Sequence, residues 1–156
     1  MLKRISLCVT SSLVLACAPA AHAHIVDNVL EHSAPNAALQ LTPIGSHESG
    51  VLGKSAAEIV AYHAASQRIL TVNARSGEVD ILDASDPTKP RKIGALSAGG
   101  DKEINSVAVR PDGLAVAAVQ QADKTDNGEA LFFNAETGEE LGRVGVGALP
   151  DNVHLT

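Results

Sequence analysis

Four polar side chains stand at the beginnings of three similar apolar segments. Glu58, Asn105 and Asp151 each lie two residues before a valine, at intervals of 47 and 46 residues, and Asn152 follows the last of them. If the three segments are strands around a common axis, these side chains form a ring of oxygens at the mouth of the central channel. Hard cations such as Ca²⁺ bind several oxygens at about 2.3–2.6 Å. The spacing therefore predicts a site for a polar ligand or a cation, with Ca²⁺ as the candidate ion.

A simpler interpretation of the same four residues stays open. Asp, Asn and similar side chains often accept hydrogen bonds from local backbone N–H groups where a strand begins. In that case these residues cap their strands and bind no ligand.

The other residues with metal-binding side chains form weaker patterns. Residues 123–129 hold three carboxylates and one asparagine, but without the alternating spacing of a calcium-binding hand loop, so we interpret them as a solvated hairpin tip. His24 could bind Cu(II) through its amine and imidazole if a leader is removed after Ala23, although a second histidine would have to lie close. His63 and His154 fall on or beside predicted strands, without the spacing of a zinc site.

The sequence lacks the motifs of the common enzyme classes. It has no Gly-x-Ser-x-Gly motif of α/β-hydrolases. Gly99-Gly100 and Gly145-Val146-Gly147 precede no predicted helix that could hold a phosphate. We therefore expect no cofactor and assign no catalytic residue.

Short runs rich in β-branched residues, each bounded by Gly, Pro, Asn or Asp, predict strands rather than helices. Two successions of four such runs follow one another along the chain, covering residues 59–62, 69–72, 79–82 and 92–96, then 106–109, 114–119, 130–133 and 141–146. Arg110-Pro111-Asp112-Gly113 is typical of a tight turn. Asp83 and Asn134 are predicted to end the third run of each succession in an Asx turn.

Four short strands repeated at this period are the pattern of a β-propeller blade. We predict an all-β fold, a partial β-propeller with blade 1 at about residues 58–97, blade 2 at about 105–147 and a third blade that begins at 151. Closed rings take about 4–8 blades, so we expect the N-terminal part of a longer protein, poorly soluble or molten by itself. A plain β-sandwich is the alternative, which the repetition of a whole four-strand unit disfavours.

The propeller is assigned to residues 39–156. Residues 39–45 are predicted to form a lone strand ahead of blade 1, of the kind that pairs with the last blade in many propellers. Pro43 would confine it to an edge or a bulge. Residues 24–38 are polar and aperiodic apart from one short apolar stretch, and we interpret them as a linker.

Residues 1–23 have the features of a secretory signal peptide. Lys3 and Arg4 precede an apolar run over residues 5–16, and Ala21-His22-Ala23 is a small-x-small cleavage motif. The apolar run is shorter than the about 20 residues that a membrane-spanning helix needs. We therefore predict export with cleavage after Ala23.

Both cysteines of the sequence lie in this leader. Val14-Leu15-Ala16-Cys17 resembles a bacterial lipoprotein box, so lipidation of Cys17 is the alternative processing route. Cys8 is the other cysteine. The exported chain is expected to fold without a disulfide or a cysteine metal site.

The charge of the chain excludes some partners. The 156 residues include 12 Lys and Arg against 18 Asp and Glu, a formal net charge of −6. Such a balance gives no electrostatic basis for binding nucleic acid or anionic lipid. Since 45% of the residues are apolar, wholesale disorder is also disfavoured.

Several motifs resemble those of the choice-of-anchor I family. They are Ala57-Glu58-Ile59-Val60-Ala61-Tyr62, Val72-Asn73, Val79-Asp80-Ile81-Leu82-Asp83-Ala84-Ser85-Asp86-Pro87, Asn105-Ser106-Val107-Ala108-Val109, Ala122-Asp123-Lys124-Thr125-Asp126 and Val146-Gly147-Ala148-Leu149-Pro150-Asp151. The resemblance covers about residues 39–156. It implies a secreted or surface-attached protein with a YVTN-like seven-bladed propeller and a variable C-terminal anchor. It implies no settled reaction.

The function we expect is that of an exported, non-enzymatic recognition or scaffold module. Its partner would be an extracellular or periplasmic ligand or protein, and it would meet a membrane only through a lipidated Cys17 or an anchor elsewhere. The alternative is a metal-assisted propeller hydrolase, lactonase-like or phosphoesterase-like, with carboxylates at the channel mouth. A quinone-dependent dehydrogenase is disfavoured because the sequence has no Trp.

Overall fold

Eight strands follow one another along the chain, and each of them contains one of the eight runs predicted from the sequence. The computed structural model describes residues 36–39, 41–50 and 56–156. The strands are β1 (Ala57–His63), β2 (Arg68–Asn73), β3 (Glu78–Asp83), β4 (Arg91–Ser97), β5 (Glu103–Val109), β6 (Leu114–Gln120), β7 (Asn127–Asn134) and β8 (Glu140–Ala148). The predicted signal peptide and most of the predicted linker lie outside the described residues, as do Cys8, Cys17 and His24. Within the described ranges there is no helix, and hence none long and apolar enough to span a bilayer.

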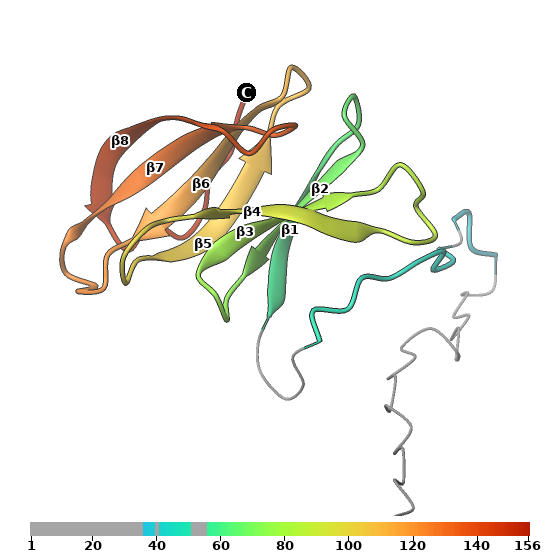
Figure 1. Ribbon diagram of the computed structural model, residues 1–156, viewed down its shortest axis with the longest axis horizontal. Coiled ribbons are helices and arrows are strands. Elements are labelled where there is room, and N and C mark those ends of the chain that lie inside the picture. The colour runs from blue at the N-terminus through green and yellow to red at the C-terminus, as the bar shows by residue number, and fades with distance from the viewer. Residues whose placement is uncertain (1–35, 40, 51–55) are drawn as a thin grey trace, which may run out of the picture.

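The strands form two antiparallel sheets of four strands each, in sequence order (Figure 1). Sheet 1 is β1-β2-β3-β4 and sheet 2 is β5-β6-β7-β8. Within each sheet, each strand pairs with the next one through a hairpin, which short polar turns make possible. The prediction of an all-β fold with two four-stranded units is thereby confirmed, and the number of further units stays a prediction.

The turns contain the side-chain hydrogen bonds that the sequence predicts. The backbone N–H of Ser85 donates to Asp83 Oδ1 at 3.1 Å, and that of Glu136 donates to Asn134 Oδ1 at 2.8 Å. In the turn between β5 and β6, Gly113 has a φ of 89°, a conformation that glycine adopts without steric cost. Local turn chemistry therefore ends these strands where the sequence indicates.

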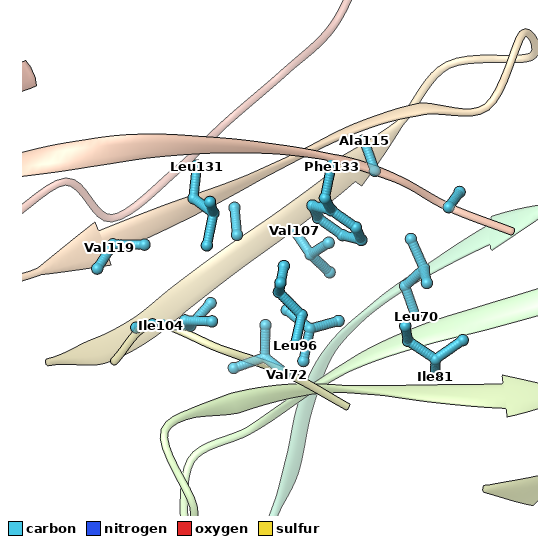
Figure 2. Packing of buried hydrophobic residues seen from close by; sticks show 14 residues of the cluster. Leu70, Val72, Ile81, Leu96, Ile104, Val107, Ala115, Val119, Leu131 and Phe133 are labelled. Atoms are coloured by element: carbon cyan, nitrogen blue, oxygen red, sulfur yellow. The ribbon is translucent and has the colours of Figure 1, made fainter. Parts of the chain in front are cut away.

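One hydrophobic core lies between the two sheets, and both contribute to it (Figure 2). In β2 and β3 every second residue faces the core, as in a half-buried strand. The core side chains of sheet 1 are Leu70, Val72, Val79, Ile81 and Leu96, and those of sheet 2 include Ile104, Val107, Ala115, Ala117, Val119, Leu131 and Phe133. Because residues of both sheets form this one cluster, the two sheets are expected to be stable only together.

Bulky side chains of sheet 1 meet small ones of sheet 2. The face of β6 that is turned to sheet 1 carries Ala115 and Ala117, both fully buried. At the turn between β7 and β8, a Cβ atom added to Gly138 would lie 2.6 Å from Ile81 Cδ1. The absence of a side chain at Gly138 thus lets this turn approach sheet 1 closely.

β1 and β5 pack against each other and run in the same direction. At their ends, His63 Nε2 lies 3.2 Å from the Pro111 carbonyl. At their beginnings, Gly77, in the turn that follows β2, lies against the Lys102 carbonyl just before β5. The beginnings of β1 and β5 therefore lie at one end of the molecule, which we call the entrance end; it comprises the segments 74–77, 98–102, 121–126 and 149–152.

The outer face of sheet 1, turned away from sheet 2, is only partly covered. Val60 and Tyr62 on this face keep 64% and 54% of their surface exposed. Residues 45–50 run past it, and Gly45 lies so close to the Pro87 and Thr88 carbonyls that no side chain would fit there (Figure 1).

Two predicted segments carry no strand. In the described part of residues 39–45 the chain is irregular and Leu39, Leu41 and Ile44 are exposed, so the prediction of a lone strand is wrong for this structure. A strand needs a partner for its backbone groups, and none is paired with this segment here. Residues 151–156 are also irregular, and the third blade stays a prediction.

Candidate functional site

The four predicted site residues all lie at the entrance end or at the first residues of the strands that begin there. Glu58 is exposed near the beginning of β1, and Asn105 is half-buried near the beginning of β5. Asp151 and Asn152 are exposed in the segment after β8. Packing of β1 against β5 places the first two on neighbouring strands.

Asn105 is joined to the segment that holds Asp151 and Asn152. Its Nδ2 donates to the Pro150 carbonyl at 3.0 Å and to Gln120 Oε1 at 2.8 Å. Gln120 Nε2 in turn donates to Glu103 Oε2 at 2.6 Å. Asn105 therefore ties β5 to β6 and to the chain after β8, and these bonds differ from the local capping bonds of the simpler interpretation.

A ring of cation ligands stays a prediction. Among the described residues, no three His, Cys, Asp or Glu side chains lie close enough to hold a metal ion together. The bond from Asn105 to Pro150 brings Asn105 next to the segment that holds Asp151 and Asn152. The Pro150 contact is the one that the sequence did not indicate, because it joins residues 45 positions apart.

The loop between β6 and β7 is a hairpin tip, as predicted. Asp123 Oδ1 accepts hydrogen bonds from the Thr125 backbone N–H at 2.9 Å and from its hydroxyl at 2.7 Å. These bonds lower the pKa of the Asp123 carboxyl, the backbone bond contributing most. A shallow, open hollow lies beside the tip, lined by Gln121, Thr125, Asp126 and Asn127.

An ionic cluster holds the connection between the sheets against sheet 2. Glu129 Oε2 lies 2.9 Å from Lys102 Nζ and 2.9 Å from Arg143 Nη1, and Arg143 Nη1 also donates to the Ala98 carbonyl at 3.0 Å. Hydrogen bonds from Lys102 and Arg143 lower the pKa of Glu129. The cluster thereby positions residues 98–102 at the entrance end.

A second hollow, of about 480 Å³, lies on the outer face of sheet 1. Its walls are residues 45–50 and side chains of β1, β2 and β3, among them Glu58, Val60, Ile69, Thr71 and Leu82. The lining combines an apolar floor with polar groups, as ligand sites and uncovered packing surfaces both do.

Asp80 is the buried polar group of this hollow, and sequence analysis missed it. Its carboxylate accepts a hydrogen bond from Asn73 Nδ2 at 3.0 Å and lies 2.6 Å from Lys92 Nζ. An acidic residue at the position between the core-facing Val79 and Ile81 was the available signal, since alternation places it on the opposite face.

His63 has a structural environment at the other end of the molecule. It is buried, and because the Pro111 carbonyl can only accept, Nε2 carries the proton that is donated to it, at 3.2 Å. Nδ1 then accepts from the Ser66 hydroxyl at 2.6 Å. His63 thus joins the β1–β2 hairpin to the turn between β5 and β6.

Comparisons with known proteins agree with the motifs in the sequence. The family model described as the choice-of-anchor I domain matches residues 58–156. A protein of unknown function from Bacteroides caccae, whose crystal structure was determined at 1.35 Å resolution, is similar with 21% sequence identity and a TM-score of 0.42. That match covers 57% of this chain and 28% of the Bacteroides protein. No curated protein matches the sequence.

Proposed function

Because the chain belongs to the choice-of-anchor I domain family, we propose that it is part of an exported, non-enzymatic β-propeller module that recognises or holds a partner outside the cell. The two four-stranded sheets would be consecutive blades of the ring. The partner, a protein or polar ligand, would bind at the entrance end.

The observation that carries this proposal is the parallel placement of the two sheets. β1 and β5 run side by side in the same direction, so equivalent turns of both sheets gather at one end. Such a gathered set of loops on a rigid scaffold is where β-rich proteins usually carry their binding residues. The partly covered outer face of sheet 1 supports the ring, since large exposed apolar faces on soluble proteins are uncommon and usually meet a partner surface.

A pair of charge-matched variants tests recognition at the entrance end. One variant carries Asp126→Asn and Asp151→Asn at this end, and the control carries Glu136→Gln and Glu139→Gln in the turn between β7 and β8 at the opposite end. All four residues are exposed, so neither variant is expected to disturb folding. The immobilised chains are incubated with proteins released from the cell envelope of the source organism, and the retained proteins are quantified.

Recognition at the entrance end predicts that a partner retained by the unmodified chain is lost with the first variant and kept with the control. Equal retention by both variants, or equal loss, would place binding elsewhere and contradict the proposal. Export is tested separately, by digestion of the chain with protease added to intact cells. A chain protected until the cells are lysed would refute the exported location.

A further inference from the structure

The hairpin between β6 and β7 ends in Asn127-Gly128, the one Asn-Gly pair of the sequence. Asn127 is exposed and Gly128 is buried. No hydrogen bond of the Asn127 side chain occurs among the residues that the structure describes, whereas other asparagines of the turns are engaged. No side-chain hydrogen bond to the described part of the chain therefore holds Asn127 Cγ away from the backbone nitrogen of Gly128, and the side chain is open to water.

The regular strand pairing is interrupted directly after Asn127, which lies opposite Ala148 on β8. The β6–β7 register ends at Glu129. Toward β8 the register is irregular between Asn127 and Glu129, and Gly128 has no opposite residue there. Such irregularities leave a residue out of the hydrogen-bonded ladder, so strand pairing does not fix Gly128, the residue that follows Asn127.

The packing around Gly128 excludes every other residue type. A Cβ atom at this position would lie 2.5 Å from the Val119 carbonyl oxygen and 2.5 Å from Pro150 Cδ. Because glycine has no side chain to shield its amide nitrogen, it is the neighbour that leaves an asparagine most open to attack. The fold thus requires the residue that makes Asn127 chemically labile.

We propose that Asn127 is a site of spontaneous deamidation in the folded chain. The Gly128 backbone nitrogen loses its proton and forms a bond to Asn127 Cγ, and the bond from Cγ to Nδ2 breaks. Ammonia leaves with the proton, and a five-membered imide remains. Water then opens the imide at either carbonyl, which gives aspartate or isoaspartate, and no oxidant or other co-reactant is needed.

Either product changes the entrance end. A new carboxylate appears beside Asp126 and close in sequence to Glu129, so the negative charge of the hairpin increases. Isoaspartate also adds one backbone atom where Gly128 is confined by Pro150 and Val119. The inference goes beyond the proposed recognition role and does not depend on it, but the modified residue lines the hollow at that end.

Two other asparagines of the chain serve as internal references. Asn73 Oδ1 accepts hydrogen bonds from the Arg75 and Ser76 backbone N–H groups, and Asn134 Oδ1 accepts them from those of Glu136 and Thr137. Both are followed by alanine. Their side chains are held in Asx turns, so their amides are expected to persist.

The test is incubation of the folded chain at mildly alkaline pH and body temperature, followed by peptide mass spectrometry and isoaspartate labelling. Circular dichroism before and after incubation verifies that the chain stays folded. Asn127→Gln is the matched control, because a glutamine would have to form a six-membered imide, which forms far less readily. Asn127→Asp provides the mass and charge standard. The same incubation in urea gives the rate for the unfolded chain.

We expect loss of the Asn127 amide with release of one equivalent of ammonia, while the Asn73 and Asn134 amides remain. Asn127→Gln should abolish the ammonia release and the isoaspartate signal. Two outcomes would overturn the proposal. One is an intact Asn127 amide in the folded chain when the urea-treated chain has reacted, and the other is equal loss at Asn73 or Asn134.

Discussion

Sheets 1 and 2 repeat the same order of strands but differ in how they are buried. In β2 the buried residues alternate with half-buried ones, whereas every residue of β6 from Ala115 to Gln120 is buried. The difference is concentrated in one cross-strand pair. Thr71 lies opposite Asp80 in sheet 1, and the equivalent pair in sheet 2 is Ala117 opposite Leu131.

This comparison shows that the repeated sequence pattern determines where strands form, whereas the segments packed against each sheet determine which of its residues are buried. Polar Thr71 and Asp80 suit a face that keeps some contact with water, and Asp80 is satisfied there by Asn73 and Lys92. The apolar run of β6 suits a strand covered on both faces. After β8 the chain returns to β5 at Pro150, and we infer that it supplies part of this cover.

A substitution in the core that the two sheets share is expected to reduce stability the most. Phe133→Ala, in sheet 2, removes a fully buried ring and is expected to lower the free energy of unfolding by about 3–5 kcal/mol. Tyr62, the one tyrosine, lies on β1, so its fluorescence reports sheet 1. If the sheets share one core, urea titrations followed by Tyr62 fluorescence and by circular dichroism should shift together.

Phe132→Ala, half-buried on the other face, is the control for this prediction. A Tyr62 transition unaffected by Phe133→Ala would contradict the shared core.

A reciprocal exchange tests the difference between the two cross-strand pairs. Ala117→Thr forces a hydroxyl and extra volume into a fully buried position and should destabilise the chain by about 2–3 kcal/mol. Thr71→Ala, at the equivalent half-buried position, should change stability by about 0.5 kcal/mol or less. Thermal unfolding measures both, and equal effects would show that the outer face of sheet 1 is as closed as the core-facing side of sheet 2.

The hydrogen bonds of His63 are expected to contribute less to the free energy of unfolding. His63→Ala leaves the Pro111 carbonyl without its partner and opens space beside Gly113, which should cost about 2 kcal/mol. Ser66→Ala removes only the bond to Nδ1 and should cost about 1 kcal/mol. Denaturant titration of the two single variants measures the difference. A smaller loss for His63→Ala than for Ser66→Ala would mean that the histidine does not join the sheets.

Acid should weaken the ionic cluster at the entrance end. The pKa of Glu129 lies below its ordinary value of 4.5 because Lys102 and Arg143 donate to it. A lowered pKa in the folded chain stabilises the fold above the ordinary value, and this contribution is lost as the pH falls through the folded pKa. We expect a loss of about 1 kcal/mol from the cluster below pH 4.5, measured as unfolding free energy against pH.

Two substitutions distinguish the contribution of sheet 2 to this acid dependence from that of sheet 1. Glu129→Gln should lower stability near neutral pH and flatten the acid dependence. Asp83→Asn does the same test in sheet 1, where hydrogen bonds from Ser85 and the charges of Arg68 and Arg91 lower the pKa of Asp83. An acid dependence unchanged by Glu129→Gln would assign the loss to other carboxylates.

The sequence was sufficient to predict the strands but not the contacts between distant segments. Turn residues such as Asp83 and Asn134 act locally, so their effect can be derived from the residues next to them. The prediction of a strand at 39–45 failed because a strand depends on a partner that lies elsewhere. The bond from Asn105 to Pro150 and that from His63 to Pro111 join residues 45 and 48 positions apart. Only the path of the folded chain brings such groups together.

The small residues of β6 limit how this molecule could be rebuilt. Thr71 and Asp80 of sheet 1 occupy the positions that Ala117 and Leu131 hold in sheet 2, and Ala117 and Leu131 are fully buried in the core. A hybrid made by duplicating sheet 1 would place a threonine and a carboxylate in the core, where Ala117 and Leu131 lie. The two sheets, although alike in strand order, therefore cannot replace each other. A redesign that adds or exchanges sheets must transfer each packing face together with the face that it packs against.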